Sequence, residues 1–226
     1  MKLNVKYALK QGGQITVVLA FIACDSRLTV ADVKPLNPDL IPAAIQRGQQ
    51  ARKSDDIFTL FDGVRTPRFS GSGRPRGFSV MIRTPLSEVA YRAFEAKRKY
   101  EPFGVDSVVV QPLHEQSVII IVEPSTNLGG YFKYASAPAS IFSSVQKVVL
   151  RRGQDIITPL HAKFHDVVFS TEHGKRDTYK GGEFIFPLQV FDPALGPLEI
   201  VVIPQDGEPG DEAIKKLKVK DLQKLE

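Results

Sequence analysis

The stretch LRRGQDI, residues 150–156, shows the pattern that decides the fold class. An apolar run ends at Leu150, polar residues surround Gly153, and a second apolar run follows. A glycine between two such runs is typical of the turn of a β-hairpin. We therefore expect two antiparallel strands here, residues 145–150 and 155–159.

Short runs of the same kind recur from residue 105 onward, with turn residues between them. Strands at such spacing are typical of an antiparallel sandwich or barrel. We expect an immunoglobulin-like sandwich over residues 102–226, without the cysteine and tryptophan landmarks of antibody domains. In the last strand Leu217 and Val219 should point inward, and a short helix should follow; a continuous helix from Asp211 is the alternative. The other expected strands are 105–110, 117–122, 167–170, 183–186, 198–203 and, last, 213–219.

Residues 40–101 have a different pattern, which predicts a small α+β unit. The clearest helix spans 84–100, because Thr84 can cap it, Pro85 suits its first turn and apolar residues follow at helical spacing. A weaker helix is expected over 40–53, where Gly48 lowers helix stability by about 1 kcal/mol relative to alanine. Strands are expected at 57–61 and 77–83. The fold class is thus mainly β with a small α+β part.

Composition excludes several classes of protein. The 226 residues carry a formal charge of +5, and the first 23 hold three lysines and no acid, so the remainder carries only +2. A balance so close to zero gives no broad nucleic-acid surface. The single cysteine forms neither an internal disulfide nor a Cys-x-x-Cys zinc site. Beyond residue 23 no apolar run approaches the roughly 18 residues of a membrane-spanning helix.

The N-terminus combines three lysines, the largely apolar run ITVVLAFIA (residues 15–23) and the lone Cys24. This arrangement resembles a bacterial lipoprotein signal over residues 1–24. The resemblance implies that residues 1–23 are removed and that the thiol of Cys24 is diacylated. Residues 24–39, with Pro35 and Pro38, would then be a tether. Asp25 resembles the aspartate that retains some lipoproteins at the inner membrane, so the choice of membrane is open.

The same residues also fit an internal hairpin. Phe21 stands where lipoprotein signals prefer leucine, and residues 2–10 alternate between apolar and polar side chains as a strand does. In that alternative Gln11, Gly12 and Gly13 form the turn, residues 15–23 a buried strand, and Cys24 an inert core thiol.

The sequence contains no recognisable catalytic or metal-binding motif. His161 and His165 are four apart on an expected strand, which separates them by about 13 Å, too far to share one metal ion. His114 and His173 fall in polar stretches. We therefore predict no catalytic residues, no metal and no cofactor. Aromatic residues beside glycine pairs are candidates for a binding rim: Tyr131, Phe132, Tyr134 and Tyr179.

We expect a cell-envelope lipoprotein, facing the periplasm or exterior, that binds other envelope proteins without enzymatic activity. Its loops or a sheet edge would make the contact, and the lipid on Cys24 would hold it on the membrane. A soluble β-rich protein with an N-terminal hairpin is one alternative. A hydrolase using carboxylates or a histidine, with a cleft between residues 40–101 and 102–226, is another, and a structural subunit with long exposed strand edges is a third.

Intact-mass analysis of the purified protein tests the lipid anchor. The expected chain lacks residues 1–23 and gains the mass of its acyl chains, whereas the hairpin alternative retains Met1 through Ala23 without added mass.

Overall fold

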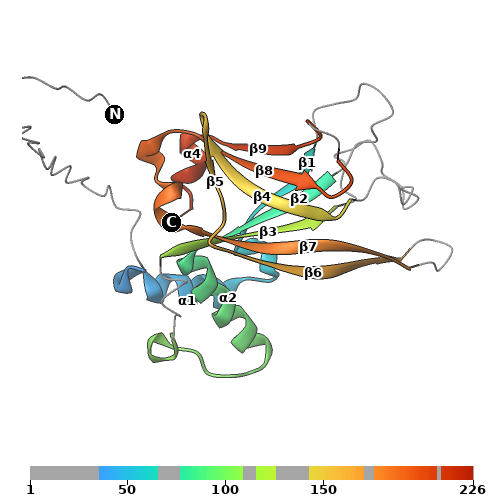
Figure 1. Cartoon of the computed structure of the whole chain (residues 1–226). Helices are drawn as coiled ribbons and strands as arrows, with labels where there is room; N and C mark the ends of the chain where they lie inside the picture. The colour runs from blue at the N-terminus through green and yellow to red at the C-terminus, as the bar shows by residue number, and fades with distance from the viewer. Residues whose placement is uncertain are drawn as a thin grey trace, which may run out of the picture. The chain divides into compact units, whose positions relative to one another are not determined.

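Two antiparallel sheets form most of the computed structural model, which describes residues 36–65, 77–108, 116–125, 143–170, 176–207 and 210–225 (Figure 1). One sheet has the strand order β1-β2-β3-β7-β6 and the other the order β5-β4-β8-β9. The expected fold class, mainly β with a small α+β part, is confirmed. The strands are β1 (Thr59–Arg65), β2 (Gly77–Arg83), β3 (Ser117–Pro124), β4 (Val145–Arg152), β5 (Asp155–Ile157), β6 (His161–Ser170), β7 (Arg176–Pro187), β8 (Leu198–Pro204) and β9 (Ala213–Leu217).

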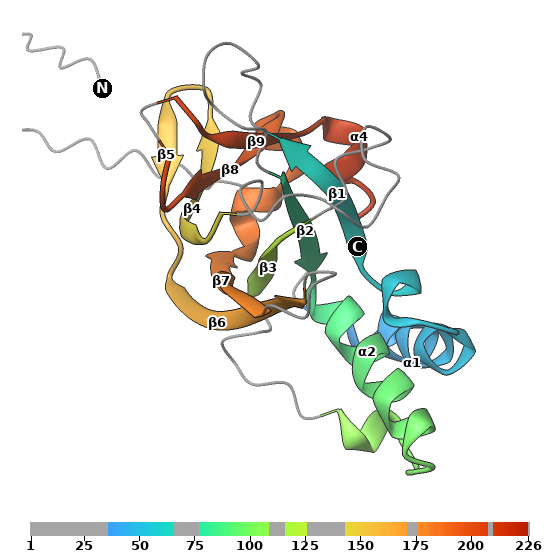
Figure 2. The ribbon, with the colours of Figure 1, turned by 90° about the vertical axis from the view of Figure 1, so that its right-hand side faces the viewer.

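The helical part is smaller. Helices α1 (Ile41–Gln50) and α2 (Pro85–Arg98) lie side by side (Figure 2), and the one-turn helix α4 (Val219–Leu222) follows β9. Within the described ranges no helix has the length and apolar character needed to cross a bilayer. Short 3₁₀ turns complete the connections: η1 (Pro38–Leu40), η2 (Ser54–Asp56), η3 (Val105–Ser107), η5 (Leu188–Phe191) and η6 (Pro193–Leu195).

The main hydrophobic core lies between the two sheets. Alternate residues of each strand point to one face, so Phe78, Val80 and Ile82 of β2 are all at most 1% exposed. The facing sheet contributes Leu198, Ile200 and Val202 of β8 in the same way. The core therefore joins strands from both halves of the chain.

The turn at Gly153 forms as expected. Residues 151 and 152 pair with 156 and 155, and Gly153 has a φ of 61°, a conformation that glycine adopts at little cost. The hairpin β4–β5 is thereby confirmed, although β5 ends at Ile157 rather than at 159.

Local signals also predicted the two long helices. The Thr84 Oγ1 accepts a hydrogen bond from the Ser87 N–H at 3.2 Å, and α2 begins at Pro85. Helix propensity disfavours a glycine within α1, but tertiary packing explains Gly48. A Cβ at this position would come within 2.0 Å of the Ala90 carbonyl oxygen of α2. Gly48 therefore permits the two helices to approach closely.

The expected boundary at residue 101 does not separate two sheets. Strands β1 and β2, from residues 40–101, lie in the same sheet as β3, β7 and β6. The first strand also begins later than expected, at Thr59, because Ile57 and Phe58 pack in the core of the helix pair instead.

Two further predictions are wrong. In the strand expected at 105–110, residues 105–107 form the 3₁₀ turn η3 instead and Val105 is exposed, while 109 and 110 lie outside the described residues. Val219 does not point inward, because β9 ends at Leu217 and Val219 begins α4 with 38% exposure. Leu217 is buried as predicted, and the continuous helix from Asp211 does not form.

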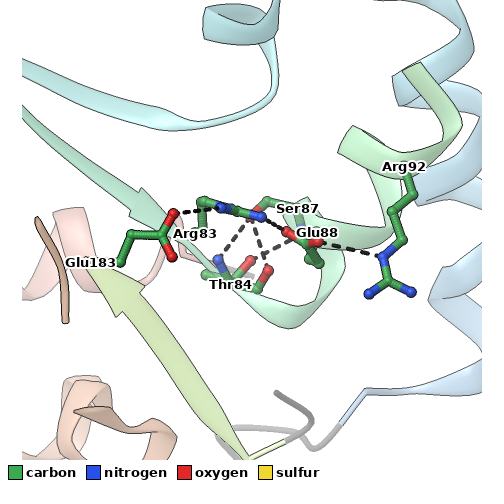
Figure 3. A network of polar contacts seen from close by, with 6 residues as sticks. All are labelled: Arg83, Thr84, Ser87, Glu88, Arg92 and Glu183. Atoms are coloured by element: carbon green, nitrogen blue, oxygen red, sulfur yellow. Dashed lines mark hydrogen bonds and ion pairs between the residues drawn. The ribbon is translucent and has the colours of Figure 1, made fainter. Parts of the chain in front are cut away.

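Arg83, at the end of β2, links the helix pair to the sheet (Figure 3). Its guanidinium forms an ion pair with Glu88 of α2 and lies 4.0 Å from Glu183 of β7. The same group stands 5.5 Å from the ring centre of Phe58 and 5.6 Å from that of Tyr91, so it also makes cation–π contacts. Glu88 is only 12% exposed and therefore depends on this partner.

We predict that Arg83→Ala lowers the free energy of unfolding by about 2–4 kcal/mol, because it leaves a nearly buried carboxylate without its main cation. Arg92→Ala is the control, since Arg92 also pairs with Glu88, at 3.4 Å, but is 33% exposed. Its expected cost is below about 1 kcal/mol. Urea denaturation measures both; equal losses would contradict the role assigned to Arg83.

Candidate functional site: the free edge of β6

The hairpin of β6 and β7 extends beyond the rest of its sheet (Figure 1). The two strands pair from His161 to Ser170, whereas β3 pairs with β7 only as far as Gly182. Residues 176–181 of β7 are therefore paired with β6 alone, as a two-stranded ribbon. The sequence predicts a strand that includes His161 and His165 and leads into 167–170, and another at 183–186. It gives no strand over the polar stretch TEHGKRDTYKGG, residues 171–182, which has no apolar alternation.

β6 is the last strand of its sheet. In the described part of the chain, no strand pairs with its second edge. A ten-residue edge strand leaves alternate backbone N–H and C=O groups directed away from the sheet, where another extended segment can bind them. Natural edges of this length are usually covered or interrupted, so a free one is a candidate contact surface.

One face of β6 carries exposed apolar side chains. Ala162 is opposite Phe184, which is buried in the core, so Ala162 points to the core side of the sheet. Because side chains alternate along a strand, Phe164 and Val168 point to the same side. Phe164 is nevertheless 44% exposed and Val168 56% exposed. We call Ala162, Phe164 and Val168 the apolar row.

The apolar row is continuous with the main core. The rings of Phe164 and Phe184 meet edge to face, with their centres 5.6 Å apart, and Phe184 is only 1% exposed. Leu160, which precedes β6, adds a further apolar side chain at 63% exposure. The apolar row thus extends the hydrophobic core to a region that the four-stranded sheet does not cover.

Charged residues interrupt and flank the row. Asp166 lies between Phe164 and Val168 on the same face and is opposite Lys180 of β7. On the other face, the His165 Nε2 lies 3.3 Å from the Glu123 Oε1 of β3. A charge in the middle of an apolar edge is a common device against unselective strand pairing.

Tyr179 belongs to the projecting ribbon. Its ring packs edge to face on Phe169, with 5.9 Å between the ring centres. Burial raises the pKa of its phenol, and the carboxylates of Asp177 and Asp206 raise it further. The neighbouring Lys180 N–H donates to the Ser144 Oγ at 3.0 Å, which connects the ribbon to the chain just before β4.

Of the predicted site residues, the structure describes only Tyr179, on β7. Cys24 and the other rim residues, Tyr131, Phe132 and Tyr134, lie outside the described residues, as do residues 1–23. The rim therefore stays a prediction. The signal that sequence reasoning missed is the apolar alternation of Ala162, Phe164 and Val168, which is short and interrupted by a charge.

The described histidines do not build a hydrolytic or metal site. His161 and His165 both lie on β6, as expected. Among the described residues, no group of three or more His, Cys, Asp or Glu side chains could hold a metal ion. The described lining of the hollow beside α2 and α4 contains no histidine, and neither does that of the hollow beside α1. His114 and His173 lie outside the described residues.

No family model, curated protein or solved structure matches the chain. The likeness to immunoglobulin domains consequently stays a prediction.

The environment of Tyr179 predicts a loss of stability in alkali. Because its pKa is higher in the folded chain, the folded state retains the proton longer than the unfolded state, and stability falls as pH rises above about 10. We expect Tyr179→Phe to reduce this loss between pH 10 and pH 12. Thermal melts of both proteins at each pH measure the difference; parallel curves would contradict the assignment.

Proposed function

We propose that the protein is a lipid-anchored module of the cell envelope that binds an extended segment of another envelope protein along the free edge of β6. The observation that supports this function best is the apolar row on an edge strand with no described partner. We base the lipid on Cys24 and the envelope location on the N-terminal sequence. We base the binding edge on the exposed apolar side chains of β6.

Strand addition suits this edge. The backbone of an added strand would complete the hydrogen bonds of β6, and its alternate side chains would cover Phe164 and Val168. Covering exposed apolar surface contributes about 25 cal/mol per Å². Main-chain bonds supply affinity in this mode of binding, while the pockets for alternate side chains supply selectivity.

The row also defines the chemistry of the partner. Asp166 stands between Phe164 and Val168, so the matching segment has two apolar residues, each separated by one position from a central lysine or arginine. Opposite charges across a strand pair are stabilising, by about 0.2–1 kcal/mol, and like charges are destabilising. A partner with an acidic residue at the central position is disfavoured.

The carboxylate and histidine hydrolase has less support than the binding module. No observation on the described residues brings a histidine and an acid into a hollow together. The close pair of His165 and Glu123, both in the described part of the chain, lies on the surface, with its side chains 35% and 50% exposed.

Site-specific photocrosslinking in cells tests the binding edge. A photoreactive residue at Val168 is expected to capture a partner through a segment with the alternating apolar and basic pattern. The same residue at Lys147, on the exposed surface of β4, is the control position. A synthetic peptide of the captured segment should bind the full chain and slow hydrogen exchange of the β6 amides.

Two substitutions test whether the apolar row makes the contact with the peptide. We expect Val168→Glu to weaken peptide binding at least tenfold, about 1.4 kcal/mol, because a carboxylate replaces an apolar contact. Lys147→Glu, at the exposed control position on β4, introduces the same charge opposite the uncharged Ile203 and should have a small effect. Equal crosslinking at 147 and 168, or capture of a second copy of this chain alone, would overturn the proposal.

A further inference from the structure

A hollow lies at residues that belong neither to β6 nor to the projecting ribbon. It has a volume of about 280 Å³, and five parts of the chain line it: the start of the described chain, the N-terminus of α2, the start of β3, the turns η5 and η6, and the end of α4 with the residues after it. No described lining residue belongs to β6 or to the ribbon. The described lining is Leu36, Asn37, Leu40, Thr84, Pro85, Leu86, Val118, Leu188, Phe191, Pro193, Leu222, Gln223 and Leu225.

The chemistry of the wall is that of a hydrocarbon site. Most of the described lining is aliphatic, Phe191 adds one aromatic ring, and none of the described lining side chains is charged. Val118, Phe191 and Leu222 are at most 3% exposed, so the inner wall is part of the core. Ligand sites are typically largely apolar with a few polar groups that orient the ligand.

The few polar groups are all neutral. Asn37, Thr84 and Gln223 are the polar residues of the described lining, and the Asn37 Oδ1 already accepts the Asp39 N–H at 3.0 Å. The Thr84 Oγ1 already accepts the Ser87 N–H as the cap of α2. A ligand with a charged end would have to bury that charge without a described counter-ion, which is costly. An uncharged polar end matches the site better.

The volume of the hollow and its distance along the chain from Cys24 restrict the class of ligand further. The volume lies just below the 300–1,000 Å³ of ordinary small-molecule pockets, which suits one short chain rather than a two-chain lipid. Leu36 follows Cys24 by twelve residues, which span at most about 40 Å. If Cys24 is acylated, as the proposed function holds, the hollow stays within reach of the membrane surface and of single-chain lipids there.

We infer that this hollow binds the hydrocarbon chain of a single-chain lipid with an uncharged polar end. The site is separate from the β6 edge and adds a small-molecule ligand to the proposed protein partner. The apolar, uncharged wall does not depend on the lipid anchor; only the distance between the hollow and the membrane rests on the proposed function.

The absence of tryptophan from the chain makes the test direct. In the full chain carrying Cys24→Ser, which cannot be acylated, Leu40→Trp places one fluorophore at the rim, where Leu40 is 37% exposed. Val219→Trp is the matched control, because Val219 is 38% exposed and is not part of the described lining. The probes are 1-dodecanol, dodecanoate and dodecyltrimethylammonium, which share a twelve-carbon chain and differ in charge.

We expect 1-dodecanol to shift the Leu40→Trp emission to shorter wavelength in a saturable manner and to leave Val219→Trp unchanged. The two charged probes should require at least tenfold higher concentration. Adding Leu225→Phe, which fills part of the hollow, should weaken 1-dodecanol binding at least tenfold; Leu36→Phe replaces it if thermal melts show that the first variant does not fold.

Three results would overturn the inference: no saturable shift with 1-dodecanol, equal shifts in the two tryptophan variants, or equal affinity for all three probes. Because the chain tested carries no lipid and the β6 edge is unchanged, these failures are distinct from a failure of the proposed function. That function is decided by intact mass and by crosslinking at Val168.

Discussion

The burial of apolar side chains between the two sheets is the constraint on which the other features depend. Strands β2, β3 and β7 from one sheet, and β4, β8 and β9 from the other, direct alternate residues into a single core. Each fully buried large side chain contributes about 1.5–3 kcal/mol, whereas an exposed ion pair such as Arg98 with Glu95 contributes about 0–1 kcal/mol. Packing, rather than surface charge, therefore holds the two sheets together.

The candidate binding edge follows from where this packing stops. β3 pairs with β7 only up to Gly182, so the ribbon beyond that point has two strands and its core-side face is not fully covered. Phe164 connects the buried core with this uncovered face, since it contacts the buried Phe184 while remaining 44% exposed. An apolar margin of this kind favours a partner that continues the sheet.

Several elements could be predicted because their signals are local. Thr84, Pro85 and the helical spacing after them identify α2, and Gly153 identifies the β4–β5 turn. The strand β2 was predicted at the residues it occupies, Gly77–Arg83, because its alternating side chains reflect a half-buried strand. In contrast, the polar half of β7 has no such alternation, since it lies in a ribbon with little core to face.

The fold class, the two long helices and most strand positions follow from the sequence, because spacing, caps and turns act between near neighbours. Only the tertiary structure decided that β1 and β2 share a sheet with β3, β7 and β6, that Gly48 accommodates a second helix, and that β6 forms an edge. It also brought Leu36, Val118, Phe191 and Leu222 around one hollow. The physical reason is that these features depend on contacts between residues distant in the chain, which no local pattern specifies.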